Sequence, residues 1–189
     1  RIGAAGLGRL GHQHAYNLRF AVPGVELVAL CDVNAERLHA TARDWGVART
    51  YTDFDAMINS GGLDAVAIVS PSHLHTRQIA AALEQGLHVF SEKPLGTTVQ
   101  ECRIAEAAVE KHPDRVFMLG FMRRYDPSYV YAKKMIGEGR IGRPILFRGY
   151  CQDPESAIQG AIAYAGHSGG QFIDMAVHDI DLARWFLGS

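Results

Sequence analysis

Ile2-Gly3-Ala4-Ala5-Gly6-Leu7-Gly8-Arg9-Leu10-Gly11 stands at the start of the chain and decides its fold class. A short apolar run, typical of a strand, leads into the pattern G-x-G-x-x-G, and a helical stretch follows directly. Here Gly6 permits a tight turn, Gly8 lets a pyrophosphate approach the backbone, and Gly11 allows close packing of helix on strand. A glycine-rich turn can also be only a turn. Alone, the pattern predicts a strand, a turn and a helix whose N-terminus faces phosphates.

Asp32 supports this interpretation, because it ends the apolar run 27–31 and lies 21 residues beyond Gly11. A carboxylate at the end of the second strand accepts the ribose hydroxyls of a dinucleotide, and its charge repels a 2′-phosphate. We therefore expect NAD as the cofactor, in preference to NADP. Arg37 lies five positions further on and would soften that preference at the same site. A solvated charge on the exposed face of the next helix is the simpler interpretation of Arg37.

Apolar runs rich in β-branched residues alternate with helical stretches up to about residue 120. Strands are expected at 2–5, 25–31, 65–69, 87–91 and 115–119, and helices at 9–21, 35–45, 74–85 and 99–111. This alternation predicts an α/β fold with a doubly wound parallel sheet and helices on both faces. The texture changes after Gly120, so we place a domain boundary there. Beyond it we expect a helix at 128–138, a strand at 144–151, a loop at 152–169 and a last helix at 171–187.

The composition is that of an ordinary globular protein. The 189 residues are 48% hydrophobic and 21% charged, with a formal net charge of -1, which favours neither nucleic acid nor a membrane surface as a partner. Three cysteines without a C-x-x-C pair suggest neither a disulfide framework nor a zinc site, and fit a cytoplasmic location. We expect a small-molecule partner. The chain starts inside a strand and stops after an apolar helix, which suggests part of a longer polypeptide.

Lys93 follows the expected strand 87–91 and precedes Pro94. The carboxyl ends of parallel strands are where open α/β sheets place ligands and reacting groups. Proline keeps the residue before it extended, so the backbone would aim the lysine side chain. This position makes Lys93 the first candidate for chemistry. A structural ion pair with a nearby carboxylate, or a solvated strand end, is the alternative.

The loop after strand 65–69 holds Ser70, Ser72 and His75, and lies where it can contact the nicotinamide ribose. Ser72 is equally well explained as the N-cap of the following helix. The H-x-H pairs at 12–14 and 73–75 lack the further spaced ligands that a metal site needs, so we expect no metal.

Asp174, His178 and Asp181 fall at i, i+4 and i+7 in the last helix, as one polar stripe on a mostly apolar element. An exposed face with a helical ion pair would explain the stripe without any chemistry. Against that, Asp174 can hold the imidazole of His178 one turn away. A histidine oriented in this way is the usual group for accepting a hydroxyl proton.

Taken together, these motifs resemble the Gfo/Idh/MocA oxidoreductase family, and most closely its inositol 2-dehydrogenase branch. The resemblance rests on Gly6-x-Gly8-x-x-Gly11, Asp32, Glu92-Lys93-Pro94, Gly120-Phe121-Met122-Arg123-Arg124-Tyr125 and Asp174-x-x-x-His178. It implies an NAD-binding Rossmann domain at 1–120 and the first part of a substrate-binding α/β domain at 121–189. The large antiparallel sheet of that second domain is missing from the sequence, and with it the expected dimer or tetramer interface.

The resemblance also implies roles for individual residues. Lys93, Asp174 and His178 correspond to the catalytic trio, and together with Met122 and Arg123 they would contact substrate. The cofactor would lie against Gly6, Gly8, Arg9, Leu10, Gly11, Asp32, Ser70, Ser72, His75, Glu92 and Lys93.

The expected reaction is oxidation of a secondary hydroxyl of a cyclic polyol or sugar, with hydride passing to the nicotinamide. His178 would accept the hydroxyl proton while Lys93 supplies positive charge beside the oxygen, and which of the two is the formal base stays open. One alternative is a dehydrogenase of another monosaccharide or sugar derivative. The other is a non-catalytic dinucleotide-sensing subunit, which would have no need of the trio.

Overall fold

The computed structural model describes residues 1–152, 154–160, 162 and 169–188. Contacts between residues divide the chain into two compact units, Arg1–Leu119 (unit 1) and Gly120–Ser189 (unit 2).

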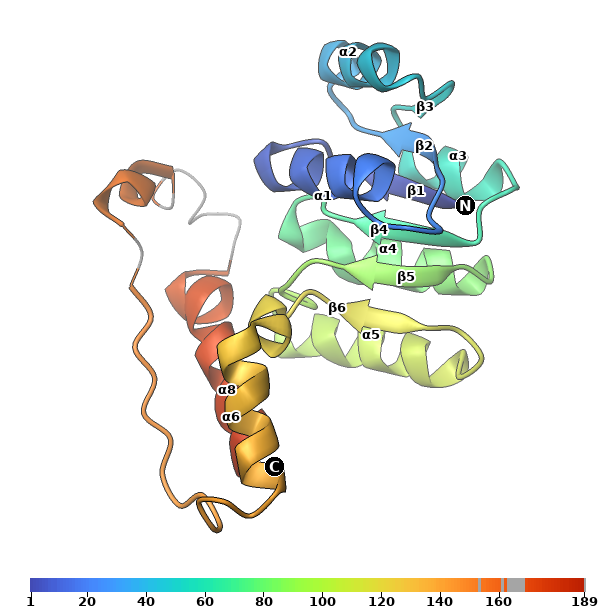
Figure 1. Cartoon of the computed structure of the whole chain (residues 1–189). Coiled ribbons are helices and arrows are strands. Elements are labelled where there is room, and N and C mark those ends of the chain that lie inside the picture. Colours follow the sequence, from blue (N-terminus) through green and yellow to red (C-terminus); the bar gives the residue numbers. More distant parts are fainter. Residues whose placement is uncertain (153, 161, 163–168, 189) are drawn as a thin grey trace. The chain divides into compact units, whose positions relative to one another are not determined.

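Unit 1 is built on a six-stranded parallel sheet in the order β3-β2-β1-β4-β5-β6 (Figure 1). The strands are β1 (Ile2–Ala5), β2 (Leu27–Cys31), β3 (Arg49–Tyr51), β4 (Ala65–Ile68), β5 (His88–Ser91) and β6 (Phe117–Leu119). The chain builds outward from β1 to β3, then returns to the other side of β1 with β4. This is the doubly wound order of dinucleotide-binding sheets, so the predicted fold class is confirmed. In such sheets ligands bind beyond the carboxyl ends of the strands.

Helices cover both faces of this sheet. They are α1 (Arg9–Phe20), α2 (Ala35–Trp45), α3 (Phe54–Asn59), α4 (His75–Glu84), which follows a 3-10 turn at Ser72–Leu74, and α5 (Val99–Lys111). One cluster of buried side chains joins the sheet to α1 and α2 and includes Ala15 and Leu38. A second cluster joins it to α3 and α4 and includes Met57 and Ile79. The alternating crossovers therefore bury both faces.

Local sequence explains where the helices begin and end. Asn34 caps α2 by accepting a hydrogen bond from the backbone amide of Arg37, and Gly46 closes that helix in the left-handed region at φ 67°. Thr98 and Glu101 form a reciprocal capping box at the start of α5.

Two short elements were not predicted. Strand β3 has three partly buried residues, and α3 has six residues behind an Asp53 cap. Neither is long enough to show a clear period of two or 3.6 residues, so periodicity could not reveal them.

Unit 2 contains a 3-10 turn at Met122–Tyr125, α6 (Pro127–Gly137), a 3-10 turn at Glu155–Ala157, a π-helical turn at Phe172–Ala176 and α8 (Val177–Leu187). The predicted helices at 128–138 and 171–187 are confirmed in position. The loop expected at 152–169 contains the turn at 155–157 and helical residues 158–160, while 153, 161 and 163–168 lie outside the described residues.

The strand expected at 144–151 is wrong. Its residues have no regular structure, and Ile145 and Leu146 are 92% and 77% exposed. A strand forms by pairing its backbone with a neighbour, and the described part of unit 2 contains no strand to pair with. Most of the segment is therefore exposed, although Phe147 is partly buried and its ring lies 5.9 Å from that of Phe186.

Candidate functional site

The glycine loop between β1 and α1 has the geometry that the sequence predicts. Gly6 lies in the left-handed region at φ +89°, and a Cβ added there would lie 2.5 Å from the carbonyl oxygen of Val69. A Cβ on Gly11 would lie 2.1 Å from the carbonyl oxygen of Gly6. Both positions therefore exclude any side chain. A Cβ on Gly8 would meet nothing within 4 Å, so this glycine lines open space.

That open space lies at the N-terminus of α1. Gly8 is the N-cap of this twelve-residue helix, contributes no side-chain cap, and is followed by a first turn without acidic residues. Arg9 and Leu10 occupy that turn with exposed side chains. Free backbone N–H groups and the helix dipole favour an anion at such a position. The loop therefore fits the pyrophosphate of a dinucleotide.

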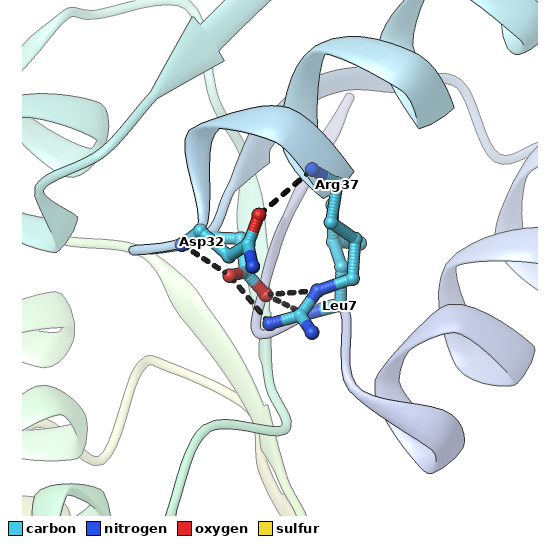
Figure 2. Close-up of polar contacts among 4 residues, drawn as sticks. Leu7, Asp32 and Arg37 are labelled. Atoms are coloured by element: carbon cyan, nitrogen blue, oxygen red, sulfur yellow. Dashed lines mark hydrogen bonds and ion pairs between the residues drawn. The ribbon is translucent and has the colours of Figure 1, made fainter.

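Asp32 lies at the end of β2 (Figure 2). Its side chain is buried, with only 5% of the residue exposed. Its carboxylate accepts hydrogen bonds from the backbone amide of Leu7 at 2.6 Å and from that of Asn34 at 2.8 Å. Burial acts to raise the pKa of Asp32, but hydrogen bonds from Arg37 and the two amides outweigh burial, and the pKa is lowered. The charged carboxylate thus holds the glycine loop against the end of β2.

The side chain of Arg37 pairs with Asp32. Its Nη2 lies 2.8 Å from Oδ1 of Asp32 and its Nε lies 3.3 Å from Oδ2, so the guanidinium spans both carboxylate oxygens (Figure 2). The side chain of Arg37 is exposed on α2, as the simpler interpretation expects, but it is paired with Asp32 and not merely solvated. In the first turn of α2 the long side chain can fold back over the end of β2 and pair with a buried charge.

Ser70 and Ser72 lie beyond the carboxyl end of β4. Ser70 donates to the side chain of Gln78 on α4. Ser72 is buried and opens the 3-10 turn, while Leu74 is the N-cap of α4, so the prediction that Ser72 caps this helix is wrong. Pro71 is the N-cap of the 3-10 turn Ser72–Leu74, and this turn comes directly before α4. Contact of either serine with cofactor stays a prediction.

His75 is 1% exposed and lies between two strand ends. Its Nδ1 is 2.8 Å from the carbonyl oxygen of Pro94, and its Nε2 is 2.9 Å from that of Ser70. Both partners only accept, and a neutral ring donates to one of them at a time. The geometry makes His75 a brace between the loops after β4 and β5; contact with cofactor stays a prediction.

Lys93 follows β5 at the carboxyl end of the sheet, with a partly buried side chain and a cis peptide bond to Pro94. Its backbone amide donates to Oε2 of Glu92 at 3.1 Å. The other oxygen of Glu92 lies 2.8 Å from Nε2 of His14 on α1. The sequence pattern did not predict this contact, since the H-x-H spacing of His14 indicated only a possible metal ligand. It ties the Glu92-Lys93 turn to the helix that carries the glycine loop.

Of the residues of unit 2 predicted to contact substrate, Arg123 is held by an ion pair. Arg123 Nη1 lies 2.7 Å from Asp179, and its Nη2 lies 3.1 Å from the sulfur of Cys151. The neighbouring Arg124 makes a two-pronged pair with Asp181 at 2.8 and 2.7 Å. Met122 is 65% exposed. The sequence does not reveal these ion pairs, because the spacing of Asp181 places it in one stripe with His178 and the partners lie 56 and 57 residues apart.

The last helix is not regular where that stripe begins. Asp174 lies in the π-helical turn Phe172–Ala176, and His178 and Asp181 lie in α8. A π turn changes the angle per residue, so the prediction of one regular α-helical stripe is wrong. His178 is 9% exposed and meets Phe121 edge-on at 6.3 Å between ring centroids. Lys93 belongs to unit 1 and the other two residues to unit 2, so the trio as a whole stays a prediction.

A surface hollow of about 640 Å³ lies on unit 2. It is lined by Phe121, Arg124, Lys133, Val177, Ile180, Asp181, Arg184, Trp185 and Gly188. Neither Asp174 nor His178 is among these residues, so the hollow is not the site predicted for substrate.

Two family models cover this arrangement. Residues 1–121 match the oxidoreductase family with an NAD-binding Rossmann fold, Gfo/Idh/MocA, and residues 129–189 match the Gfo/Idh/MocA C-terminal domain. The chain belongs to the Gfo/Idh/MocA oxidoreductase family. Unit 1 therefore carries the NAD-binding Rossmann fold of this family.

Similar members of the Gfo/Idh/MocA family act on inositols. The chain is 41% identical to scyllo-inositol 2-dehydrogenase (NAD(+)) of Bacillus subtilis, over 100% of this chain and 54% of that protein. It is 35% identical to myo-inositol 2-dehydrogenase of Thermotoga maritima, over 100% of this chain and 55% of that protein. The chain thus spans about half the length of the curated relatives that it matches.

A solved structure gives the same picture. Scyllo-inositol dehydrogenase from Lactobacillus casei, with bound NAD(H) and scyllo-inositol, has a TM-score of 0.93 and 42% identity. The match covers 99% of this chain and 56% of that one.

The histidine pairs considered for metal have other surroundings. The ring of His12 lies beside that of Trp45, with centroids 4.7 Å apart and tilted planes, and Nε2 of His14 lies 2.8 Å from a carboxylate oxygen of Glu92. Across the described residues, no group of three or more His, Cys, Asp or Glu side chains is arranged to hold a metal. In the same part of the chain, no helix has the length and apolar character needed to cross a membrane.

Proposed function

We propose that this chain carries the NAD site and part of the catalytic machinery of a dehydrogenase that oxidises a secondary hydroxyl of an inositol-like cyclic polyol. The observation that carries the proposal is the match to a dehydrogenase solved with both NAD(H) and scyllo-inositol bound. In this proposal residues 1–120 bind NAD and residues 121–189 begin the substrate-binding domain. NAD, when bound, supplies the acceptor for the hydride.

The residues of the chain would divide the remaining work. His178, oriented by Asp174, accepts the hydroxyl proton as the carbon loses hydride and becomes a ketone. Lys93 places positive charge beside the oxygen, where negative charge develops. Met122 and Arg123 contact the polyol, with Arg123 held by Asp179.

The cofactor contacts follow the strand ends of unit 1. The glycine loop takes the pyrophosphate and Asp32 the adenosine ribose, while Ser70, Ser72, His75, Glu92 and Lys93 surround the nicotinamide side. Two contacts support the proposed nicotinamide site. The ring of His75 joins the loops after β4 and β5, and the pair between His14 and Glu92 joins the loop after β5 to α1.

We further propose that the whole protein is a cytoplasmic homo-oligomer, a dimer or tetramer, formed through the antiparallel sheet expected for its second domain. Size-exclusion chromatography with light scattering of the whole protein measures the oligomeric state. A monomer at micromolar concentration would contradict this proposal.

Lys93→Met tests the catalytic proposal. Methionine keeps much of the length of the side chain and removes its charge, so turnover of scyllo-inositol should fall by at least about a thousandfold, since charge stabilisation and proton transfer are both lost. NAD binding, followed by calorimetry, should change by no more than about threefold, roughly 0.7 kcal/mol. Activity near that of the unaltered protein would remove Lys93 from the mechanism. Loss of NAD binding together with turnover would show that Lys93 acts mainly through its contact with the cofactor, which would contradict the catalytic role.

A further inference from the structure

Arg37 and two backbone amides together occupy the acceptor positions of the Asp32 carboxylate, which is the group proposed to bind the cofactor ribose. A carboxylate offers about four acceptor positions on its two oxygens. The amides of Leu7 and Asn34 occupy one position each, and Nε and Nη2 of Arg37 occupy two more (Figure 2). Any ribose hydroxyl that donates to Asp32 must therefore share with or displace one of these groups.

The backbone amides are the less movable donors. Leu7 is 1% exposed, within the glycine loop, and Asn34 is the N-cap of α2. The Arg37 side chain is 43% exposed, so it can swing away into solvent. The hydroxyls of an NAD ribose would thus compete chiefly with Arg37 for the oxygens of Asp32.

A 2′-phosphate meets the same pair differently. It carries negative charge and accepts hydrogen bonds, so Asp32 repels it and a guanidinium attracts it. The bonds to Asp32 use Nε and Nη2, which leaves Nη1 outside this pair. Arg37 is thus positioned both to mask the charge of Asp32 and to donate to a phosphate beside it.

We propose that Arg37 is a specificity-determining residue that reduces the ratio of NAD affinity to NADP affinity at this site. The inference rests on NAD binding by unit 1. Arg37 weakens the NAD complex, because it competes with the ribose hydroxyls for the oxygens of Asp32. It strengthens the NADP complex, because its positive charge lies beside the 2′-phosphate. The site should therefore bind both dinucleotides, with NAD bound more tightly by a modest factor.

Arg37→Ala is the variant that tests this proposal. The backbone amide of Arg37 donates to the side chain of Asn34, and that bond does not depend on the arginine side chain, so the helix cap is retained. Arg43→Ala is the matched control, because Arg43 is exposed on the same helix and its loss changes net charge equally. Thermal unfolding of both variants checks that each is folded.

The measurement is calorimetric binding of ADP-ribose and of 2′-phospho-ADP-ribose to the 189-residue chain. These probes report the adenosine end alone and need no turnover. Arg37→Ala should weaken the 2′-phosphorylated probe by about 10- to 100-fold, the loss expected for a charge-assisted hydrogen bond. Binding of ADP-ribose should stay within about threefold or become tighter. Arg43→Ala should change neither probe.

Equal weakening of both probes by Arg37→Ala would overturn the proposal, because it would show that Arg37 only supports Asp32. An unchanged affinity for the 2′-phosphorylated probe would overturn it as well. If the unaltered chain binds neither probe, the NAD site itself is contradicted, and the inference with it. If Arg37→Ala does not fold, Arg37→Gln and Arg37→Lys decide by the same ratio, with lysine expected to retain part of the affinity for the 2′-phosphate.

Discussion

At the scale of single residues, Asp32 connects folding with cofactor recognition. The same carboxylate receives the amide of Leu7 from the glycine loop, the amide of Asn34 from the start of α2, and the Arg37 side chain. A buried charge is tolerated only where such donors replace its water. The residue that we propose to bind the ribose therefore also fixes the loop that we propose to bind the pyrophosphate.

This double role predicts a pH dependence of stability. Because the pKa of Asp32 is lowered in the folded state, its contribution is fully present above the unfolded value of about 4 and is lost as pH falls through the folded value. Asp32→Asn removes the titrating group. We expect the variant to be less stable than the unaltered chain at pH 7, and the difference to shrink below about pH 4. Urea unfolding at pH 7 and below about pH 4 measures this difference in stability. A difference that is constant with pH would contradict the lowered pKa of Asp32 in the folded state.

At the scale of elements, different glycines of the loop between β1 and α1 serve packing and ligand binding. Gly6 and Gly11 exclude a Cβ because other backbone atoms occupy that space, whereas Gly8 faces open space. The same alanine substitution should therefore act on folding at Gly11 and on ligand binding at Gly8.

Gly11→Ala should destabilise unit 1 by about 2 kcal/mol or more, since the new methyl group overlaps a backbone carbonyl and the helix must move. Gly8→Ala should leave the unfolding midpoint nearly unchanged, and should weaken NAD by about tenfold or more because the methyl group fills the approach of the pyrophosphate. Thermal unfolding and calorimetric NAD titration of the pair measure both effects. Unaltered NAD binding in Gly8→Ala would place the pyrophosphate elsewhere.

Sequence patterns predicted the long elements well because each has a clear period and clear ends. Strand β1, the glycine loop and α1 lie as expected, since the turn requires glycine at fixed positions. The strand at 144–151 failed because pairing depends on a neighbour, which a local pattern does not reveal. Arg37 and His14 were misjudged for a related reason. Their partners, Asp32 and Glu92, are brought near by the fold, and side-chain choice among several possible partners is not visible in the sequence.

At the scale of the whole molecule, the proposed chemistry draws on both units. Unit 1 contributes the NAD-binding Rossmann fold and Lys93, and unit 2 contributes Asp174 and His178. Such a division is common in dehydrogenases, where one domain holds the cofactor and another orients the substrate against it. Residues 129–189 match the C-terminal domain of the Gfo/Idh/MocA family, and the chain spans about half of its relatives. The catalytic proposal therefore applies to the protein that carries both domains in full.

The most direct test uses the longest polypeptide that contains this chain, with NAD and a panel of inositols and pyranoses. Formation of reduced nicotinamide is followed by its absorbance. We predict reduction of NAD with scyllo-inositol or myo-inositol, faster than with any pyranose. If NAD binds but no member of the panel reduces it, the dehydrogenase proposal is contradicted and a dinucleotide sensor is favoured.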